Sequence, residues 1–161
     1  MQNKKHLSLS LSLIIWVVAL IVIGGVIGSL TKPEMSTWYR TLNRSPLTPP
    51  NHVFPVAWTL LYGMIGACGW VIWRSQAFPK LSVVKTLYAA QLIFNWSWTP
   101  LFFYYHRVGF SLIVLGSMDI LVSALVFLAY PKMRTASLLM MPYLLWILFA
   151  TYLNFYIWWY N

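Results

Sequence analysis

The sequence predicts an all-α integral membrane protein, a bundle of five transmembrane helices that forms a single domain over residues 1–161. Hydrophobic residues make up 60% of the chain and charged residues only 8%, whereas a soluble domain usually carries about a quarter charged residues. The apolar residues form five long runs, each long enough for a helix of roughly 20 residues across a bilayer. Because the runs are apolar on all sides, they do not fit the alternating strands of a β-barrel.

The five runs set the order of the elements. They cover about residues 7–30, 54–73, 81–104, 108–130 and 136–160. The first run follows Lys4 and Lys5, as a signal peptide would, but its apolar core is too long and no small-residue cleavage site follows it. The connections are short except for residues 31–53, a polar, basic and proline-rich loop. Its paired prolines, Pro49 and Pro50, predict a stiff extended path. We expect either a lid or binding segment, or a spacer that lies on the headgroups.

The basic residues predict the orientation of the chain, because five spans place the two termini on opposite sides. The amino-terminal side has seven Lys and Arg, namely Lys4, Lys5, Arg74, Lys80, Lys85, Lys132 and Arg134. The other side has four, namely Lys32, Arg40, Arg44 and Arg107. The positive-inside rule therefore predicts a cytoplasmic amino terminus and an external long loop. Helical spans also favour a bacterial inner (plasma) membrane over an outer membrane.

The polar composition excludes several classes of chemistry. The two acids, Glu34 and Asp119, are 85 positions apart, which makes paired-carboxylate catalysis improbable. One cysteine, Cys68, excludes an internal disulfide and Cys-rich metal sites. The three His are scattered, so we expect no structural metal site and no covalently bound cofactor. The net charge of +9 is spread in short clusters between apolar runs, so we expect no nucleic-acid partner.

Three of the spans carry tryptophan together with an amide or hydroxyl on one helical face. These sets are Trp58, Tyr62 and Ile65, with Thr59 adjacent; Gln91, Asn95 and Trp98; and Trp146, Ala150 and Leu153, with Asn154 beside them. Ten Trp in so short a chain exceed what belts at the two membrane interfaces need. The three faces can line one cavity for a flat, largely apolar ligand, with indoles that stack and amides that orient it. The alternative is that these side chains join the helices to one another.

Three other features each have two interpretations. Asp119, the only acid within a span, is either a functional relay or a protonated side chain bonded to a neighbouring helix, and we favour the second. Gly24 and Gly28 permit close helix approach, in a homodimer seam or within the bundle. His52 stands at the start of the second span, either as a ligand of haem iron or as a solvated loop residue.

Several motifs together carry a resemblance that covers nearly the whole chain. In order they are Trp38-Tyr39-x-x-Leu42, Pro49-Pro50, Trp58-Thr59-x-Leu61-Tyr62, Gln91-Leu92-x-x-Asn95-Trp96-x-Trp98-x-x-Leu101-Phe102-Phe103 and Pro142-Tyr143-Leu144-x-Trp146-x-x-Phe149-Ala150-Thr151-x-Leu153-Asn154. This set resembles bacterial members of the tryptophan-rich sensory protein / translocator protein family, also called the peripheral-type benzodiazepine receptor family. The resemblance implies a five-helix bundle, often a homodimer, with a pocket closed by the loop after the first helix.

The resemblance also implies a ligand. Members of this family bind tetrapyrroles such as protoporphyrin IX and haem, for porphyrin transport, sensing or scavenging. The positions that match the family's pocket are Trp58, Asn95, Trp98, Trp146, Ala150 and Leu153. At the mouth of the pocket we expect Arg40 and Arg44 to pair with porphyrin propionates, with His52 beside them. The cofactor expectation is thus a porphyrin or haem held as a ligand, without a covalent link.

Two alternatives to simple binding remain. In some bacterial relatives, the residues that match Trp58 and Trp146 are implicated in light-dependent porphyrin breakdown, so the protein is either a binding protein or a porphyrin-degrading enzyme. A regulatory partner of another membrane protein is the other alternative.

The chain departs from the family pattern at two places. Arg44-Ser45-Pro46-Leu47 stands where the family often has Lys-Pro-x-Trp, so that loop tryptophan is absent. The sterol motif of animal members ends in Lys or Arg, and the corresponding region here, Trp158-Trp159-Tyr160-Asn161, has no basic residue. We therefore do not expect sterol recognition through that motif.

Overall fold

The protein was analysed as a computed structural model that describes residues 2–29 and 31–161, with the backbone alone for residues 2–8 and 32. Every regular element in the described part is helical, which confirms the predicted fold class. The long helices are α1 (Gln2–Ser29), α4 (Val53–Arg74), α5 (Leu81–Thr99), α6 (Val108–Ala129) and α7 (Arg134–Tyr160). The short ones are α2 (Lys32–Ser36), α3 (Trp38–Thr41) and the π-helix η1 (Pro100–Tyr104), which continues α5. The predicted end of the first span at residue 30 lies outside the described residues.

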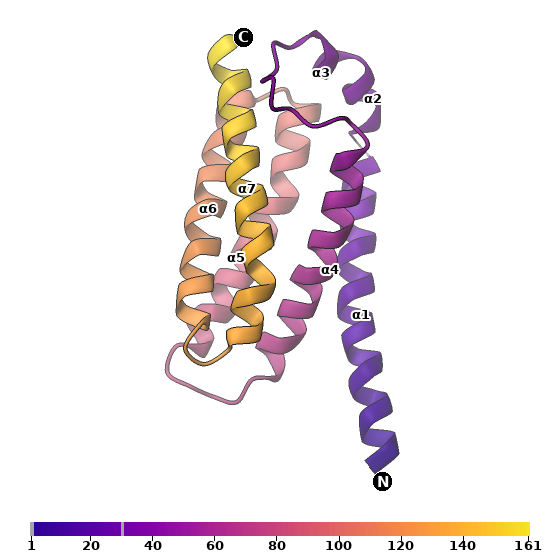
Figure 1. The fold of residues 1–161 in the computed structure, drawn as a ribbon, viewed down its shortest axis with the longest axis vertical. Helices are drawn as coiled ribbons and strands as arrows, with labels where there is room; N and C mark the ends of the chain where they lie inside the picture. The colour runs from indigo at the N-terminus through magenta and orange to yellow at the C-terminus, as the bar shows by residue number, and fades with distance from the viewer. Residues whose placement is uncertain (1, 30) are drawn as a thin grey trace.

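The long helices run side by side as one bundle (Figure 1). Neighbouring pairs are α1 with α4, α4 with α7, α7 with α6, and α6 with α5. The amino terminus lies at the same end as the α4–α5 and α6–α7 connections, and the carboxyl terminus lies at the other end beside α2 and α3. The two termini therefore lie at opposite ends of the bundle, as the sequence predicts.

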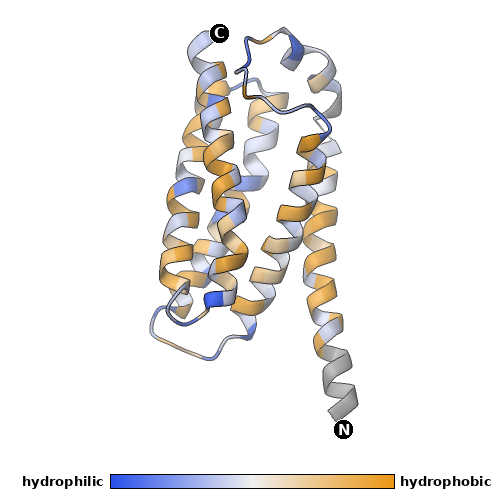
Figure 2. Cartoon of the chain, viewed as in Figure 1, coloured by the Kyte–Doolittle hydropathy of each residue, from blue (hydrophilic) through white to orange (hydrophobic). Residues whose placement is uncertain are grey.

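The helices consist of apolar residues along most of their length (Figure 2). Within the described residues, four helical segments are long and apolar enough to cross a membrane, namely Leu9–Ser29, Val53–Arg74, Val108–Ala129 and Arg134–Tyr160. Helix α5 is shorter and carries two buried amides, Gln91 and Asn95, and η1 extends it. Large apolar side chains such as Ile120 and Phe127 are more than 70% exposed, as expected for a surface in contact with lipid. The chain is an integral membrane protein.

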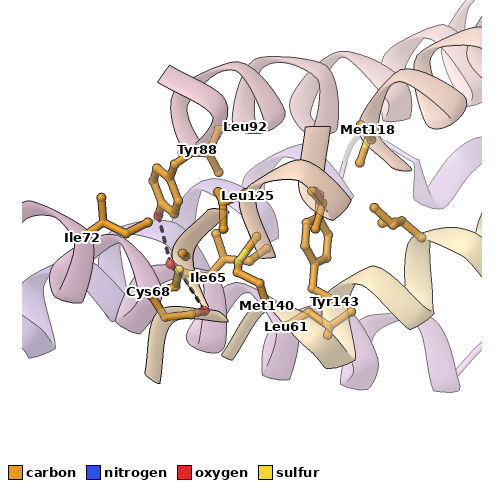
Figure 3. Packing of buried hydrophobic residues seen from close by; sticks show 14 of the residues in the cluster. Leu61, Ile65, Cys68, Ile72, Tyr88, Leu92, Met118, Leu125, Met140 and Tyr143 are labelled. Carbon is orange, nitrogen blue, oxygen red and sulfur yellow. Dashed lines mark hydrogen bonds between the residues drawn. The ribbon is translucent and has the colours of Figure 1, made fainter. Parts of the chain in front are cut away.

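The core lies where α4, α5, α6 and α7 meet (Figure 3). Ile65, Leu125 and Met140 are fully buried there. Two hydrogen bonds join helices within it: the Tyr88 hydroxyl donates to the Ile65 carbonyl oxygen at 2.9 Å, and Cys68 Sγ donates to the Ala136 carbonyl oxygen at 3.5 Å. The core therefore combines apolar packing with hydrogen bonds between helices.

The backbones of α1 and α4 meet near the midpoint of α1. A β-carbon built on Gly66 of α4 would lie 2.8 Å from both the Trp16 carbonyl oxygen and Val17 Cα, so only glycine allows this backbone contact. Nearer the end of α1, a β-carbon on Gly25 or Gly28 would meet nothing within 4 Å. At Gly24, which lies between these regions, the Tyr62 ring of α4 still packs against α1. The space beside α1 is therefore open only past this contact, at the end of the bundle that carries α2 and α3.

The segment between α1 and α4, residues 31–52, covers this end of the bundle and is called the lid below. The sequence predicts a loop over residues 31–53, and the structure adds two short helices within it. Pro33 stands in the first turn of α2, where the absence of its N–H costs no helical hydrogen bond. Residues 42–52 contain no further helix but make two turns, in which the Thr48 N–H donates to the Ser45 carbonyl oxygen and the Val53 N–H donates to the Pro50 carbonyl oxygen.

Candidate functional site

A cavity of about 790 Å³ lies between α1, α4, α5 and α7, directly beneath the lid. Small-molecule sites commonly enclose about 300–1,000 Å³ and are mostly apolar with a few polar groups. The wall of this cavity is largely aromatic and aliphatic. Its helix residues include Ile21, Gly24, Gly25, Gly28, Phe54, Pro55, Trp58, Thr59, Tyr62, Asn95, Trp98, Thr99, Phe102, Phe103, Ala150, Leu153, Asn154 and Ile157, and its lid residues include Thr31, Met35, Tyr39, Arg40, Asn51 and His52.

Five of the residues predicted to bind a ligand line this cavity together. They are Trp58 from α4, Asn95 and Trp98 from α5, and Ala150 and Leu153 from α7. The sixth, Trp146, does not lie on the cavity wall. Its ring stands edge to face against the Trp58 ring, with the centroids 6.5 Å apart and the planes at 84°. Trp146 therefore packs against Trp58 without lining the cavity itself.

Asn95 joins three helices at one end of the cavity. The Tyr62 hydroxyl of α4 donates to Asn95 Oδ1, and Asn95 Nδ2 donates to the Tyr143 hydroxyl of α7 at 2.9 Å. Asn95 is 3% exposed and Tyr143 is fully buried, so these bonds form where water does not compete. The Asn95 amide thus joins the helices and also lines the cavity. Both roles that the sequence analysis offers for this side chain are therefore present.

Asn154 forms a second junction, beside Trp98. The Trp98 Nε1–H donates to Asn154 Oδ1 at 3.2 Å, and the Ser111 hydroxyl of α6 donates to the same oxygen at 2.9 Å. Asn154 Nδ2 donates to the Val108 carbonyl oxygen at 2.9 Å. The Trp98 ring also stacks on Phe102, with centroids 5.3 Å apart. Both the edge and one face of this indole are therefore fixed before any ligand binds.

Gln91, which the sequence places on the same helical face as Asn95, does not reach the cavity. It is fully buried one turn beyond Asn95, and neither of its side-chain polar atoms has a hydrogen-bond partner among the described residues. The Tyr62–Asn95–Tyr143 junction therefore marks the floor of the cavity, and Gln91 lies beneath it.

The mouth of the cavity is basic. Arg40 and His52 line the cavity, whereas Arg44 lines an adjoining polar pocket of about 740 Å³. Arg40 and Asn51 belong to both walls, so the two spaces meet at these residues. No acidic side chain lies among the described residues that line either space. The pair of spaces therefore suits a ligand with an apolar body and an anionic edge.

Tyr39 lies beneath Arg44, whose guanidinium carbon stands 5.2 Å from the centre of the Tyr39 ring. Burial raises the pKa of the Tyr39 phenol above its ordinary value, and the Arg44 charge opposes part of that rise. The phenol is therefore neutral at physiological pH and is not an anionic partner for the Arg44 guanidinium.

The lid is fastened on two sides. On one side, His106 Nε2 lies 3.2 Å from Glu34 Oε2, and the Trp38 ring stacks on the His106 ring with centroids 4.0 Å apart. His106 adopts a left-handed backbone conformation, with φ of 52°, which turns the chain between η1 and α6. The sequence reasoning missed this contact because Glu34 and His106 are 72 positions apart.

On the other side, the lid is bonded to α7. The Asn43 N–H donates to Asn161 Oδ1 at 2.9 Å, and Asn161 Nδ2 donates back to the Asn43 carbonyl oxygen at 3.2 Å. The hydroxyls of Ser45 and Tyr152 are 2.8 Å apart. These contacts connect positions more than 100 apart in the sequence, and no local motif indicates them.

The remaining candidates have structural partners. Thr151 Oγ1 of α7 donates to Asp119 Oδ2 at 2.8 Å, as the interpretation of a side chain bonded to a neighbouring helix requires. Gly24 lies against the Tyr62 ring of the same chain, which favours packing within the bundle over a homodimer seam at this position. Among the described residues, no group of three or more His, Cys, Asp or Glu is placed to hold a metal ion.

Comparison with known proteins now decides the family. Residues 16–160 match the sequence model of the TspO/MBR family. The chain belongs to this family. The match extends from the Gly66 contact region of α1 to the end of α7, so it includes every helix that lines the cavity, and it confirms the resemblance identified from the motifs.

Individual TspO/MBR relatives are similar over most of their length. The tryptophan-rich protein TspO of Archaeoglobus fulgidus is 37% identical over 145 residues, which cover 90% of this chain and 94% of the relative. The tryptophan-rich sensory protein of Cereibacter sphaeroides is 37% identical over 128 residues, 80% and 78% of the two chains. The translocator protein of Bos taurus is 34% identical over 139 residues, 84% and 82% of the two chains.

Proposed function

We propose that this protein binds tetrapyrroles, protoporphyrin IX or haem, in the cavity beneath the lid, and that it serves porphyrin transport, sensing or scavenging. The observation that carries the proposal is the pairing of an aromatic cavity, flanked by Trp58 and Trp98, with an adjoining arginine-lined pocket. Protoporphyrin IX is flat and largely apolar and has both propionates on one edge. The macrocycle fits the chemistry of the first space and the propionates fit that of the second.

The charges at the mouth give the ligand a direction. Arg40 and Arg44 are exposed and form no ion pair within the described residues. Charge-assisted hydrogen bonds between guanidinium and carboxylate are among the stronger polar contacts. His52 lines the cavity beside Arg40 and offers an imidazole nitrogen to the iron of haem. The ligand's acidic edge would therefore point toward the lid and its apolar edge toward Asn95.

The direct test is a titration of the purified protein with protoporphyrin IX, followed by tryptophan fluorescence. We expect saturable quenching at micromolar porphyrin, and the absence of saturable quenching would overturn the proposal. The double variant Arg40→Gln/Arg44→Gln should bind about thirtyfold more weakly, since each lost contact to a charged group is worth roughly 1 kcal/mol at an exposed site and the two together about 2 kcal/mol. Lys132→Gln/Arg134→Gln, at the opposite end of the bundle, removes the same charge and should leave the affinity unchanged.

A second candidate function is light-dependent breakdown of the bound porphyrin, with dioxygen as the oxidant. The contact between Trp58 on the cavity wall and Trp146 behind it favours this candidate. Illumination of the complex should bleach the porphyrin absorption, and Trp58→Phe and Trp146→Phe should slow the bleaching at equal occupancy. Trp98→Phe, which changes an indole that has no contact with Trp146 among those observed, is the control. Equal bleaching in all variants would count against catalysis.

The regulatory alternative has a simple discriminator. A protein that is colourless as purified, ignores porphyrin and copurifies with one membrane partner would have the regulatory role instead. Association into a homodimer, which the family resemblance implies, stays a prediction for native mass measurement in detergent.

We also propose that the amino terminus is cytoplasmic and the lid external, in a bacterial inner membrane. Cysteine labelling in a Cys68→Ala background tests this orientation. Thr41→Cys on the lid should react with a membrane-impermeant maleimide in intact cells. Gln76→Cys, in the α4–α5 connection, should react only after the cells are permeabilised. The reverse pattern would invert the orientation.

A further inference from the structure

We infer that ligands reach the cavity sideways from the bilayer, through a portal between the lid-side ends of α1 and α4, while the lid stays closed. The portal is defined by Gly25 and Gly28 of α1 and by Pro55 and Thr59 of α4. The inference rests on the proposed function, because it describes how that ligand enters, and it adds a constraint on which porphyrins are accepted.

The first support is the change in packing along the seam between the two helices. Their backbones touch at Gly66, and at Gly63 a β-carbon would still meet Ile21 of α1 at 3.8 Å. Toward the lid, the Gly25 and Gly28 positions have no neighbour within 4 Å of an added β-carbon. Between these two regions, the Tyr62 ring of α4 lies against Gly24 of α1. The seam between α1 and α4 is therefore closed as far as the Gly24–Tyr62 contact and open only beyond it, at Gly25 and Gly28.

The second support is the composition of the wall at the open part of the seam. Positions 21, 24, 25 and 28 of α1 all line the cavity, and the spacing i, i+3, i+4, i+7 places them on one helical face. Three of the four are glycine. The Tyr62 ring fills the space at Gly24, whereas no side chain lies within 4 Å of a β-carbon at Gly25 or Gly28. Across the gap, Pro55 and Thr59 are exposed and line the same cavity. The cavity thus continues between the two helices.

The third support is the fastening of the lid. The Glu34–His106 pair with the stacked Trp38 ring holds one side, and the Asn43–Asn161 bonds hold the other. Opening the lid requires these contacts to break, whereas entry between α1 and α4 breaks none of them. The lateral route therefore needs the smaller rearrangement.

The route selects ligands by the distribution of their charges. The portal lies next to Ser29, where the apolar segment Leu9–Ser29 ends, so it lies at the depth where the hydrocarbon meets the headgroups. A porphyrin with its acids on one edge can slide in with its ring in the hydrocarbon and its acids at the headgroups. A porphyrin with acids on every edge would have to carry charges through hydrocarbon, at a cost of several kcal/mol each. We therefore assign the site to porphyrins whose acidic groups share one edge.

The experiment measures rates as well as affinity, by stopped-flow fluorescence with protoporphyrin IX in proteoliposomes. Gly25→Leu and Gly28→Leu should each lower the association and dissociation rates together by about tenfold and leave Kd within about twofold. Gly116→Leu is the matched control, because Gly116 lies on α6 and has no neighbour within 4 Å of an added β-carbon. Glu34→Gln, which loosens the lid, should leave both rates unchanged. A porphyrin with carboxylates on all four sides should not compete.

The contrary outcomes are distinct. Unchanged rates in both glycine variants, or faster entry in Glu34→Gln, would overturn the portal while binding itself remains. A faster dissociation rate with weaker affinity in the glycine variants would mean that leucine fills the cavity, which also contradicts the portal.

A second measurement needs no porphyrin and separates the failure of the portal from the failure of the proposed function. A spin label at Thr59→Cys, in a Cys68→Ala background, should collide more with dissolved oxygen than with a water-soluble nickel chelate. Gly28→Leu should reduce the oxygen collisions. Greater access for the nickel chelate would show that the opening faces water, and would overturn the lateral route even if porphyrin binds.

Discussion

Trp58 and Trp146 stand edge to face with their ring centroids 6.5 Å apart, and only Trp58 lines the cavity. The Trp146 ring also lies 6.1 Å from the Phe54 ring, in a similar edge-on contact. One indole is therefore placed to touch a ligand, and the other holds the first in position. The two residues, which the family resemblance treats as a pair, are thus expected to differ in their effect on binding.

Truncation of the two indoles tests this difference. Trp58→Ala should weaken protoporphyrin binding about tenfold, roughly 1.4 kcal/mol, because it removes a stacking surface. Trp146→Ala should weaken it about threefold, through a looser Trp58 ring. Isothermal titration in detergent measures both. Trp159→Ala, at a side chain that is 65% exposed near the end of α7, should have no effect. A larger effect at Trp146 than at Trp58 would contradict the geometry.

The two buried amides of α5 should respond in opposite ways to the same substitution. Asn95→Leu leaves the Tyr62 and Tyr143 hydroxyls without their shared partner, so it should destabilise the fold by about 1–2 kcal/mol. Gln91→Leu removes an amide that makes no hydrogen bond with the described residues, so it should leave stability unchanged or raise it. Thermal unfolding in detergent compares the two variants. Equal destabilisation would show that Gln91 has a partner of its own.

The α1–α4 contact depends on a single missing side chain. Gly66→Ala places a methyl group against the backbone of Trp16 and Val17, so it should force the helices apart and lower the melting temperature. Gly116→Ala, in open space on α6, should be neutral or stabilise by about 0.5–1 kcal/mol, because alanine is the better helix former. The same effect on the melting temperature in both variants would contradict the claim that the backbone contact at Gly66 stabilises the packing of α1 on α4.

His106 combines a strained backbone with two side-chain contacts, and a pair of variants separates them. Both His106→Gly and His106→Ala remove the Glu34 and Trp38 contacts. Glycine adopts the left-handed φ of 52° freely, whereas alanine does not, so the glycine variant should be more stable by about 1 kcal/mol. Hydrogen exchange of the α2–α3 amides should rise in both variants. An alanine variant as stable as the glycine variant would argue against this backbone conformation.

Long apolar runs were sufficient to predict the fold, because a bilayer leaves a long apolar segment few choices other than a helix. Helical spacing also predicted which faces of α4 and α5 line the cavity, since Trp58, Asn95 and Trp98 all lie on its wall. Spacing could not show how deep the cavity goes. Gln91 shares a face with Asn95 but lies beneath the floor, because the floor is set by tyrosines from α4 and α7.

The arrangement at the lid could not be predicted from sequence in the same way. A stripe on α7 places Trp146 with Ala150 and Leu153, yet which of two facing indoles borders the cavity depends on how α4 and α7 cross. The Glu34–His106 and Asn43–Asn161 contacts join positions 72 and 118 apart. Such pairs follow from the packed bundle and leave no periodic or local signal in the chain.

The junction at Asn95 couples ligand binding to protein stability, because the same side chain lines the cavity and joins three helices. The amide already shares its bonds with Tyr62 and Tyr143, so a ligand that takes one of those bonds weakens the seam between α4, α5 and α7 as it binds. A ligand that leaves them intact raises the unfolding free energy by the full amount that mass action gives. Ligands of equal affinity should therefore produce unequal thermal shifts. The difference between the thermal shift expected from the affinity and the shift observed measures how much free energy of helix–helix contact is lost when that ligand binds.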